Sequence, residues 1–182
     1  ALTPRTIGEQ RNMESLESIL GHSFRQLRLL TEALTHASVS YESQRSGIDN
    51  QRLEFLGDAV LQLALSHELF ARPPDSDEGR LTKARAHLVS TKSLARLARE
   101  IGIAPHLIMG RGEESSGGRE RDSTLADALE AIIGAIYLDA GLDAATQFVI
   151  RVLGNELDGL GQGLIESNPK GDLQERLQAI NS

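Results

Sequence analysis

The stretch Asn50-Gln-Arg-Leu-Glu-Phe-Leu-Gly-Asp-Ala-Val60 carries the pattern that decides the fold prediction. At about 100° per residue, a helix over this stretch has one apolar side, which consists of Leu53, Leu56, Gly57, Val60, Leu61 and Ala64. Glu54 and Asp58 lie one turn apart on the flank of that side. The stretch therefore predicts a helix that packs against a core and carries two neighbouring carboxylates.

Two carboxylates on adjacent turns repel each other, so their pairing is unfavourable unless a cation or a proton lies between them. For a lone pair of this kind, a solvated polar flank is the more common arrangement. A second acidic helix favours a metal site, because Asp127 and Glu130 are spaced three apart beside a predicted buried stripe. That stripe consists of Leu125, Leu129, Ile132, Ile133 and Ile136.

The neighbours of this second acidic pair are small, namely Ser123, Ala126, Ala131 and Gly134. Small neighbours allow another helix or a ligand to come close. If the two acidic helices cross here, four carboxylates converge, and such hard oxygen ligands suit Mg²⁺ or Mn²⁺ rather than zinc. Residue spacing alone does not establish that the helices meet.

The rest of the chain predicts an all-α fold. Aromatic residues make up 3% of the sequence, and Leu- and Ala-rich segments alternate with Gly, Pro and Ser. We expect helices near residues 13–20, 24–36, 50–71, 77–89, 92–100, 124–139 and 144–160. Asp49 and Ser123 are expected to cap the helices that follow them. Residues 39–49 and the Gly-rich segment 110–119 are expected to be irregular, and residues 159–169 to form a linker.

Bulk properties narrow the class of protein. A chain of 182 residues allows one main domain with a tail, and the absence of cysteine excludes disulfides and thiolate metal sites. Because no secretory pattern or membrane-length apolar stretch occurs, we expect a cytoplasmic protein that does not bind a membrane. The formal net charge of −7 argues against nucleic-acid binding. That objection weakens if metal ions neutralise the acidic residues and a basic module lies outside this chain.

Other residue groups are open to two interpretations. Phe55 lies opposite the apolar side, either as a singly exposed hydrophobic residue or as a contact with a partner subunit. Two basic groups could meet phosphates, although solvated basic surfaces are the simpler interpretation: Arg80, Lys83 and His87, and Arg111, Arg119 and Arg121. The histidines lack metal-ligand spacing and are interpreted as structural or surface residues. The Gly-rich segment lacks the Gly-Lys-Ser/Thr of a P-loop, which argues against a nucleotide cofactor.

Residues 50–60 resemble the signature motif of the ribonuclease III family, and further segments agree with that family in order along the chain. These are Leu34-Thr-His-Ala-Ser38, Asp77-Glu-Gly79, the Ser-Gly-Gly loop at 110–121 and Leu125-Ala-Asp-Ala-Leu-Glu-Ala131. The tail, residues 168–178, is similar to the beginning of the double-stranded-RNA-binding domain of bacterial members. The resemblance implies a catalytic domain at 1–160, a linker at 161–170 and the start of an RNA-binding domain at 171–182.

The resemblance also implies an all-α homodimer with a catalytic valley along its interface. Such an enzyme hydrolyses double-stranded RNA, leaves 5′-phosphate and 3′-hydroxyl ends with a short 3′ overhang, and processes ribosomal and messenger RNA precursors. By position, Glu54, Asp127 and Glu130 correspond to the metal ligands, and Asp58 and Glu130 to the catalytic residues. The implied cofactor is Mg²⁺, with Mn²⁺ as a substitute.

Three further positions follow from the same resemblance. Glu78 corresponds to a secondary acidic position near the site, and Phe55 to the residue that inserts into the partner subunit. Gln51 departs from the pattern, because many bacterial members carry Glu there and an amide is a poor cation ligand. Two alternatives remain open: a non-cleaving double-stranded-RNA-binding scaffold on the same fold, and a helical dimer whose acidic residues form only a solvated surface.

Overall fold

A computed structural model describes residues 15–43, 48–72 and 77–166 of the chain. Every regular element in these ranges is a helix, and the one β-type pairing is an isolated bridge between Thr35 and Ile108. After a helical segment at residues 15–20, the elements are α2 (Leu27–Ala33), α3 (Ser38–Ser43), α4 (Gln51–Phe70), α5 (Glu78–Leu88), α6 (Thr91–Ile101), η1 (Ala104–His106), α7 (Arg111–Ser115), η2 (Gly118–Glu120), α8 (Asp122–Ala140) and α9 (Leu142–Glu166). The predicted all-α fold class is therefore confirmed.

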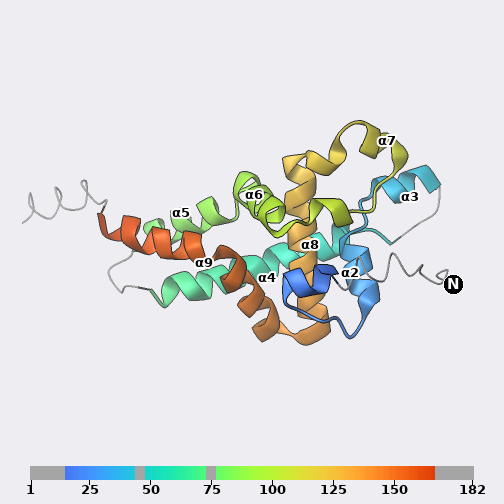
Figure 1. Ribbon diagram of the computed structural model, residues 1–182. Coiled ribbons are helices and arrows are strands. Elements are labelled where there is room, and N and C mark those ends of the chain that lie inside the picture. The colour runs from blue at the N-terminus through green and yellow to red at the C-terminus, as the bar shows by residue number, and fades with distance from the viewer. Residues whose placement is uncertain (1–14, 44–47, 73–76, 167–182) are drawn as a thin grey trace, which may run out of the picture.

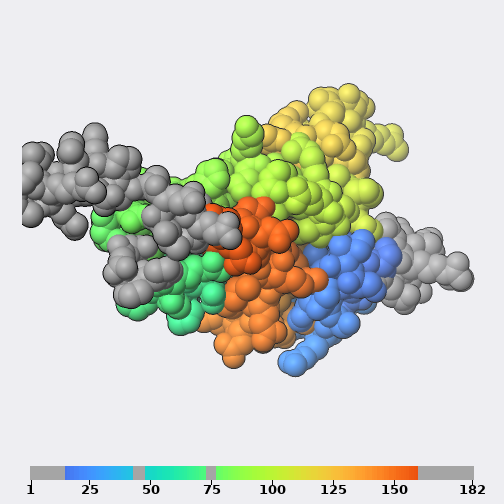
Figure 2. Space-filling model, turned by 60° about the vertical axis from the view of Figure 1, so that its left-hand side comes forward, coloured from blue at the N-terminus to red at the C-terminus, as the bar shows by residue number. Residues whose placement is uncertain are grey.

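Helix α8 is the central element of the fold. In Figure 1 it stands across α4, and α2 and α6 pack beside it. Its apolar residues are buried almost without exception, as expected for a helix covered by neighbours on several sides. Figure 2 shows the face on which α9 lies between the N-terminal segment and α6. The side chains of Ile19, Leu97 and Phe148 line a pocket where those three elements meet.

The crossing of α4 and α8 is the closest approach in the core, because both backbones carry glycine at the contact. A Cβ atom on Gly57 would lie 1.8 Å from the carbonyl oxygen of Glu130. A Cβ atom on Gly134 would lie 2.3 Å from the carbonyl oxygen of Leu53. No other residue type fits either position without moving the helices apart.

Several helix boundaries differ from those predicted, for identifiable reasons. The second helix spans only residues 27–33, because the backbone amides of Arg25 and Gln26 donate to the buried carboxylate of Asp139 instead. Its end is set by the bridge to Ile108, whose amide donates to the Leu34 carbonyl. Asp49 accepts a hydrogen bond from the Gln51 amide as predicted, although the N-cap position of α4 is Asn50.

The capping prediction for Ser123 was wrong, because α8 begins at Asp122 and Ser123 lies within its first turn. Helices α3 and α7 were not predicted, since both fall in segments expected to be irregular. They stabilise each other: the Glu42 carboxylate of α3 accepts hydrogen bonds from the amides of Arg111 and Gly112 at the start of α7, both at 2.8 Å. A contact between segments so far apart in sequence has no local signature.

Helix α9 continues to Glu166, so the first part of the predicted linker at 161–170 is helical. The glycines at 159, 161 and 163 do not end the helix, although glycine lowers intrinsic helix propensity. The rest of the predicted linker and the predicted start of an RNA-binding domain at 171–182 lie outside the described residues.

Candidate functional site

Three carboxylates from two helices converge where α4 and α8 cross. Glu54 of α4 and Asp127 and Glu130 of α8 each offer an oxygen atom, and these three oxygens lie within 4.8 Å of one another. We call these three residues the acidic cluster. All three side chains are half-buried. The sequence left open whether the two acidic helices meet, and the structure brings them together.

The glycine contact explains why the cluster forms. Because the Glu130 carbonyl touches Gly57, the turn of α4 that carries Glu54 lies against the turn of α8 that carries Asp127 and Glu130. The i, i+3 spacing then puts the two α8 carboxylates on one side of that helix, toward Glu54.

The cluster holds more negative charge than its surroundings neutralise. Burial raises the pKa of Glu130 to about 7, and the charges of Asp58, Asp127 and Glu54 raise it in the same direction. Burial, followed by the charges of Asp127 and Asp58, also raises the pKa of Glu54. Burial raises the pKa of Asp127, while the neighbouring His36 imidazole opposes that rise. A bound cation would relieve this repulsion.

The residues present fit a hard divalent cation. The donor set consists of carboxylate oxygens from three separate side chains, the ligand type that Mg²⁺ and Mn²⁺ prefer. The raised pKa of Glu130 marks a carboxylate without enough compensating positive charge within the protein.

Asp58 borders the cluster without belonging to it. Both of its carboxylate oxygens accept hydrogen bonds from the Gln62 side-chain amide, at 2.9 and 3.0 Å. Its negative charge still acts on Glu54 and Glu130. Asp58 is therefore held in a fixed orientation beside the three cluster carboxylates.

The structure does not bring Glu78 into the cluster. Glu78 lies in the first turn of α5, is exposed, and accepts a hydrogen bond from Thr82. It lines a pocket with Ser66 and Phe70, near the C-terminal end of α4. Gln51, the residue that departs from the family pattern, is exposed at the start of α4.

Phe55 projects from α4 into solvent with 81% of its surface exposed. Beside it lies a groove of about 630 Å³, lined by Phe55 itself and by Arg28, Leu29, Glu32, Gln51, Arg52, Leu53, Leu56 and Leu138. A large aromatic residue exposed next to a partly apolar groove is typical of a protein–protein contact.

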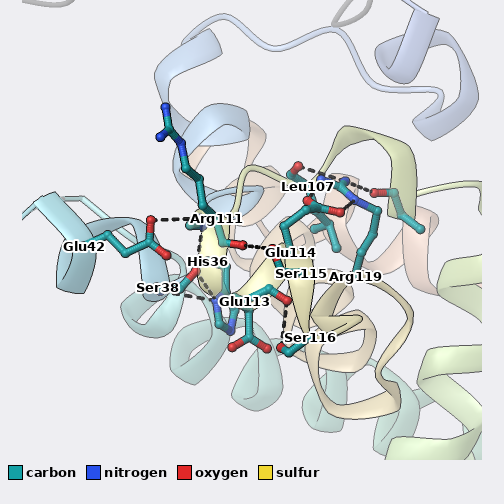
Figure 3. Close-up of polar contacts among 12 residues, drawn as sticks. His36, Ser38, Glu42, Leu107, Arg111, Glu113, Glu114, Ser115, Ser116 and Arg119 are labelled. Atoms are coloured by element: carbon teal, nitrogen blue, oxygen red, sulfur yellow. Dashed lines mark hydrogen bonds and ion pairs between the residues drawn. The ribbon is translucent and has the colours of Figure 1, made fainter.

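Two arginines of the Gly-rich segment, Arg119 and Arg121, make contacts within the protein rather than forming the solvated basic surface that was the simpler interpretation. Arg119 donates to the carbonyl oxygens of Ala104 and Leu107 and forms an ion pair with Glu114. Arg121 forms an ion pair with Glu113. Figure 3 shows the Arg119 contacts and shows the Arg111 side chain projecting away from the loop. On α5, by contrast, Lys83 and His87 are exposed.

His36 is the cluster neighbour that the sequence pattern did not identify. It was interpreted as a structural or surface histidine, because no metal-ligand spacing links it to the acidic residues. Burial raises the pKa of Asp127 and the charge of His36 lowers it, and both effects arise from tertiary packing. A histidine just after the predicted end of a helix gives no signal of this kind.

Comparison with known proteins agrees with this architecture. The ribonuclease-III-like family matches residues 26–157. "Ribonuclease 3" of Pelotomaculum thermopropionicum is 49% identical over 170 residues, which cover 93% of this chain and 70% of that protein. "Ribonuclease 3" of Symbiobacterium thermophilum is 52% identical over 159 residues, covering 87% of this chain and 67% of that protein.

Solved structures agree as well. The nuclease domain of ribonuclease III from Campylobacter jejuni, described with a region involved in dimer formation, has a TM-score of 0.74 and 43% identity. The match covers 79% of this chain and 96% of that one. Dicer from Pichia stipitis matches with a TM-score of 0.56 and 25% identity, covering 74% and 57% of the two chains. Within the described ranges, none of the helices has the length and apolar character needed to cross a membrane.

Proposed function

Because the chain belongs to the ribonuclease-III-like family, we propose that it is an endoribonuclease that hydrolyses double-stranded RNA at the acidic cluster. The observation that carries this proposal is the convergence of the Glu54, Asp127 and Glu130 oxygens within 4.8 Å. The names and folds of the relatives support the reaction class. The cluster supports a metal-dependent reaction at this place in the fold.

In this proposal, the three cluster carboxylates hold Mg²⁺, with Mn²⁺ as a substitute. When bound, Mg²⁺ supplies Lewis-acid chemistry: it lowers the pKa of water and neutralises charge on the scissile phosphate and the leaving oxygen. Glu130 must lose its proton to act as a ligand, which its pKa of about 7 permits near neutral pH. Asp58, held by Gln62, orients the attacking water. The products carry 5′-phosphate and 3′-hydroxyl ends.

The proposed active form is a homodimer with one site per subunit. Phe55 of each subunit inserts into the groove beside Phe55 of the other, because a two-fold axis pairs the same surface on both copies. The dimer-forming region described for the Campylobacter jejuni domain supports this arrangement. Two sites then cut the two strands of one duplex and leave a short 3′ overhang. The enzyme contacts RNA mainly through phosphates and 2′-hydroxyls, which favours duplex shape over sequence.

A duplex-RNA cleavage assay tests the proposal. The unsubstituted protein is incubated with end-labelled duplex RNA in Mg²⁺, in Mn²⁺ and in EDTA, alongside Glu130→Gln. We expect cleavage with either metal, none in EDTA, and none with Glu130→Gln. A duplex that is bound but intact with every divalent metal would favour a non-cleaving scaffold instead. Normal cleavage by Glu130→Gln would show that the reaction occurs elsewhere.

A further inference from the structure

Asp58 lies on α4 between two neighbours that act on its carboxylate in opposite ways. One turn before it is Glu54, a member of the acidic cluster, and one turn after it is Gln62. Side chains one turn apart on a helix lie next to each other, so the two carboxylates repel. The amide group of Gln62 instead donates hydrogen bonds to Asp58. Repulsion from Glu54 and hydrogen bonding to Gln62 therefore favour the same orientation of the Asp58 carboxylate.

The contact between Gln62 and Asp58 uses both oxygens of the carboxylate. The Nε2 atom of Gln62 lies 2.9 Å from Oδ1 and 3.0 Å from Oδ2 of Asp58. Because the two distances are nearly equal, the nitrogen lies close to the plane that bisects the carboxylate. Rotation of the carboxylate would lengthen at least one of the two bonds. A carboxylate only accepts hydrogen bonds, so the amide must present its nitrogen rather than its oxygen.

The next turn of α4 does not compete for the Gln62 amide. The Ser66 hydroxyl donates to the backbone carbonyl of Gln62 at 2.6 Å and accepts a bond from the Arg85 guanidinium at 2.7 Å. Its hydrogen is therefore used by the backbone, and α5 supplies the donor that its oxygen accepts. Both Asp58 and Gln62 are half-buried, which limits the access of water to their contact. The Gln62 side chain is thus left to hold Asp58.

Of the four carboxylates that α4 and α8 bring to this crossing, three form the acidic cluster and Asp58 stays beside it. A cation bound to the cluster would attract the Asp58 carboxylate as well. We propose that Gln62 is a positioning residue: it holds Asp58 outside the ligand set of the metal, so that Asp58 remains available to the attacking water. The inference rests on the proposed metal-dependent function. In this role, Gln62 divides four similar acidic groups between two tasks.

Two substitutions at position 62 change the hydrogen bonding of the side chain while keeping its length and its helix propensity. Methionine has no donor for Asp58, and an ionised glutamate has only acceptors and repels it. Ser66→Ala is the matched control. It removes the next contact on α4, including the bond from Arg85, and leaves the contact between Gln62 and Asp58 in place. Thermal unfolding of each metal-free variant reports on the fold.

Metal binding and catalysis are measured separately. Binding of Mn²⁺ without RNA is followed by the electron paramagnetic resonance of the free ion, and cleavage of duplex RNA at saturating Mg²⁺ gives kcat and KM. We expect Gln62→Met to bind Mn²⁺ at least as tightly as the unsubstituted protein, because a released Asp58 can approach the ion. Its kcat should fall about tenfold, with little change in KM. Gln62→Glu should cleave no faster than Gln62→Met, and Ser66→Ala should keep the normal kcat even if it unfolds at a lower temperature.

A normal kcat for Gln62→Met overturns the inference, and Gln62→Glu decides the question in the same way if the methionine variant does not fold. Weaker Mn²⁺ binding by Gln62→Met, or a loss of kcat that additional Mg²⁺ restores, also overturns it, because Gln62 would then support the metal site itself. An equal loss of kcat in Ser66→Ala would assign the effect to packing. If the unsubstituted protein binds Mn²⁺ no better than Glu130→Gln does, the proposed metal site fails, and the role of Gln62 fails with it. If that site is intact and the Gln62 variants cleave normally, the positioning role alone is wrong.

Discussion

Replacing Glu130 with glutamine is expected to stabilise the metal-free protein while abolishing cleavage. Burial and the charges of Asp58, Asp127 and Glu54 raise the pKa of Glu130 from 4.5 to about 7. Ionising this carboxylate in the folded protein therefore costs free energy, and a glutamine at this position avoids that cost because it stays neutral. At about 1.36 kcal/mol per pKa unit, the shift corresponds to at most about 3–4 kcal/mol. Partial solvent access reduces our expectation to about 1–2 kcal/mol.

The sign of the pH dependence follows from the raised pKa. Between pH 4.5 and about 7, the folded protein holds a proton at Glu130 that the unfolded chain has released. The stabilising effect of that proton is complete below pH 4.5 and is lost as the pH rises through 7. The advantage of Glu130→Gln should therefore be full at pH 8 and small at pH 4.5.

Thermal unfolding in EDTA, followed by circular dichroism, measures this advantage. For a domain of this size, 1–2 kcal/mol corresponds to a rise of about 3–6 °C in the unfolding midpoint at pH 8. Glu68→Gln, on α4 but outside the acidic cluster, is the control and should not reproduce the rise. Adding Mg²⁺ should reduce or reverse the difference, because metal binding stabilises only the unsubstituted site. An equal gain at both pH values, or none at pH 8, would refute the reasoning.

Three other substitutions test the crossing of α4 and α8, the buried carboxylate of Asp139 and the proposed subunit contact. Gly57→Ala should cost about 3 kcal/mol or more in denaturant unfolding, since its Cβ would lie 1.8 Å from the Glu130 carbonyl. Gly154→Ala is the control, because an added Cβ there meets no atom within 4 Å beyond its chain neighbours and the backbone of its own helix, and an equal loss would contradict the close-contact explanation. Asp139→Asn should cost about 1–3 kcal/mol at pH 7, because Asp139 accepts bonds from His22, Arg25 and Gln26. Burial raises the pKa of Asp139, but these bonds outweigh it and hold the pKa below its usual range. The stabilisation by Asp139 is therefore present at neutral pH and lost in acid. If the stability of Asp139→Asn and of the unsubstituted protein changed in parallel with pH, this explanation would be wrong. Phe55→Ala should shift sedimentation velocity profiles toward the monomer, and an unchanged profile at low protein concentration would remove Phe55 from the interface.

The sequence predicted the structure best where local spacing within one helix determines which face is buried. The apolar side of residues 50–64 predicted the buried face of α4, because helical periodicity depends only on local spacing. The two acidic pairs, Glu54 with Asp58 and Asp127 with Glu130, could likewise be recognised from their spacing in the sequence. Whether they meet depends on Gly57 and Gly134, and each glycine by itself signals only the absence of a side chain.

Tertiary contacts account for what the sequence could not predict. The short helices α3 and α7 depend on Glu42, whose carboxylate reaches amides far along the chain. The arginines at 119 and 121 were interpreted as a solvated basic surface, with phosphate contact as the alternative, but Glu114 and Glu113 pair with them within the same loop. In each case a polar side chain has several possible partners, and only the folded chain selects one.

The glycine crossing links the stability of the core to the geometry of the acidic cluster. Restoring an ordinary 3.4 Å contact around a Cβ on Gly57 would move α4 and α8 apart by about 1.6 Å. Two oxygens bound to one Mg²⁺ lie at most about 4.2 Å apart, because each Mg–O bond is about 2.1 Å. The cluster oxygens lie within 4.8 Å of one another, so side-chain movements of a few tenths of an ångström are enough to bring all three into that range. A further 1.6 Å would remove Glu54 from the reach of an ion held by Asp127 and Glu130, so the same two glycines that pack the core also keep the site able to bind metal.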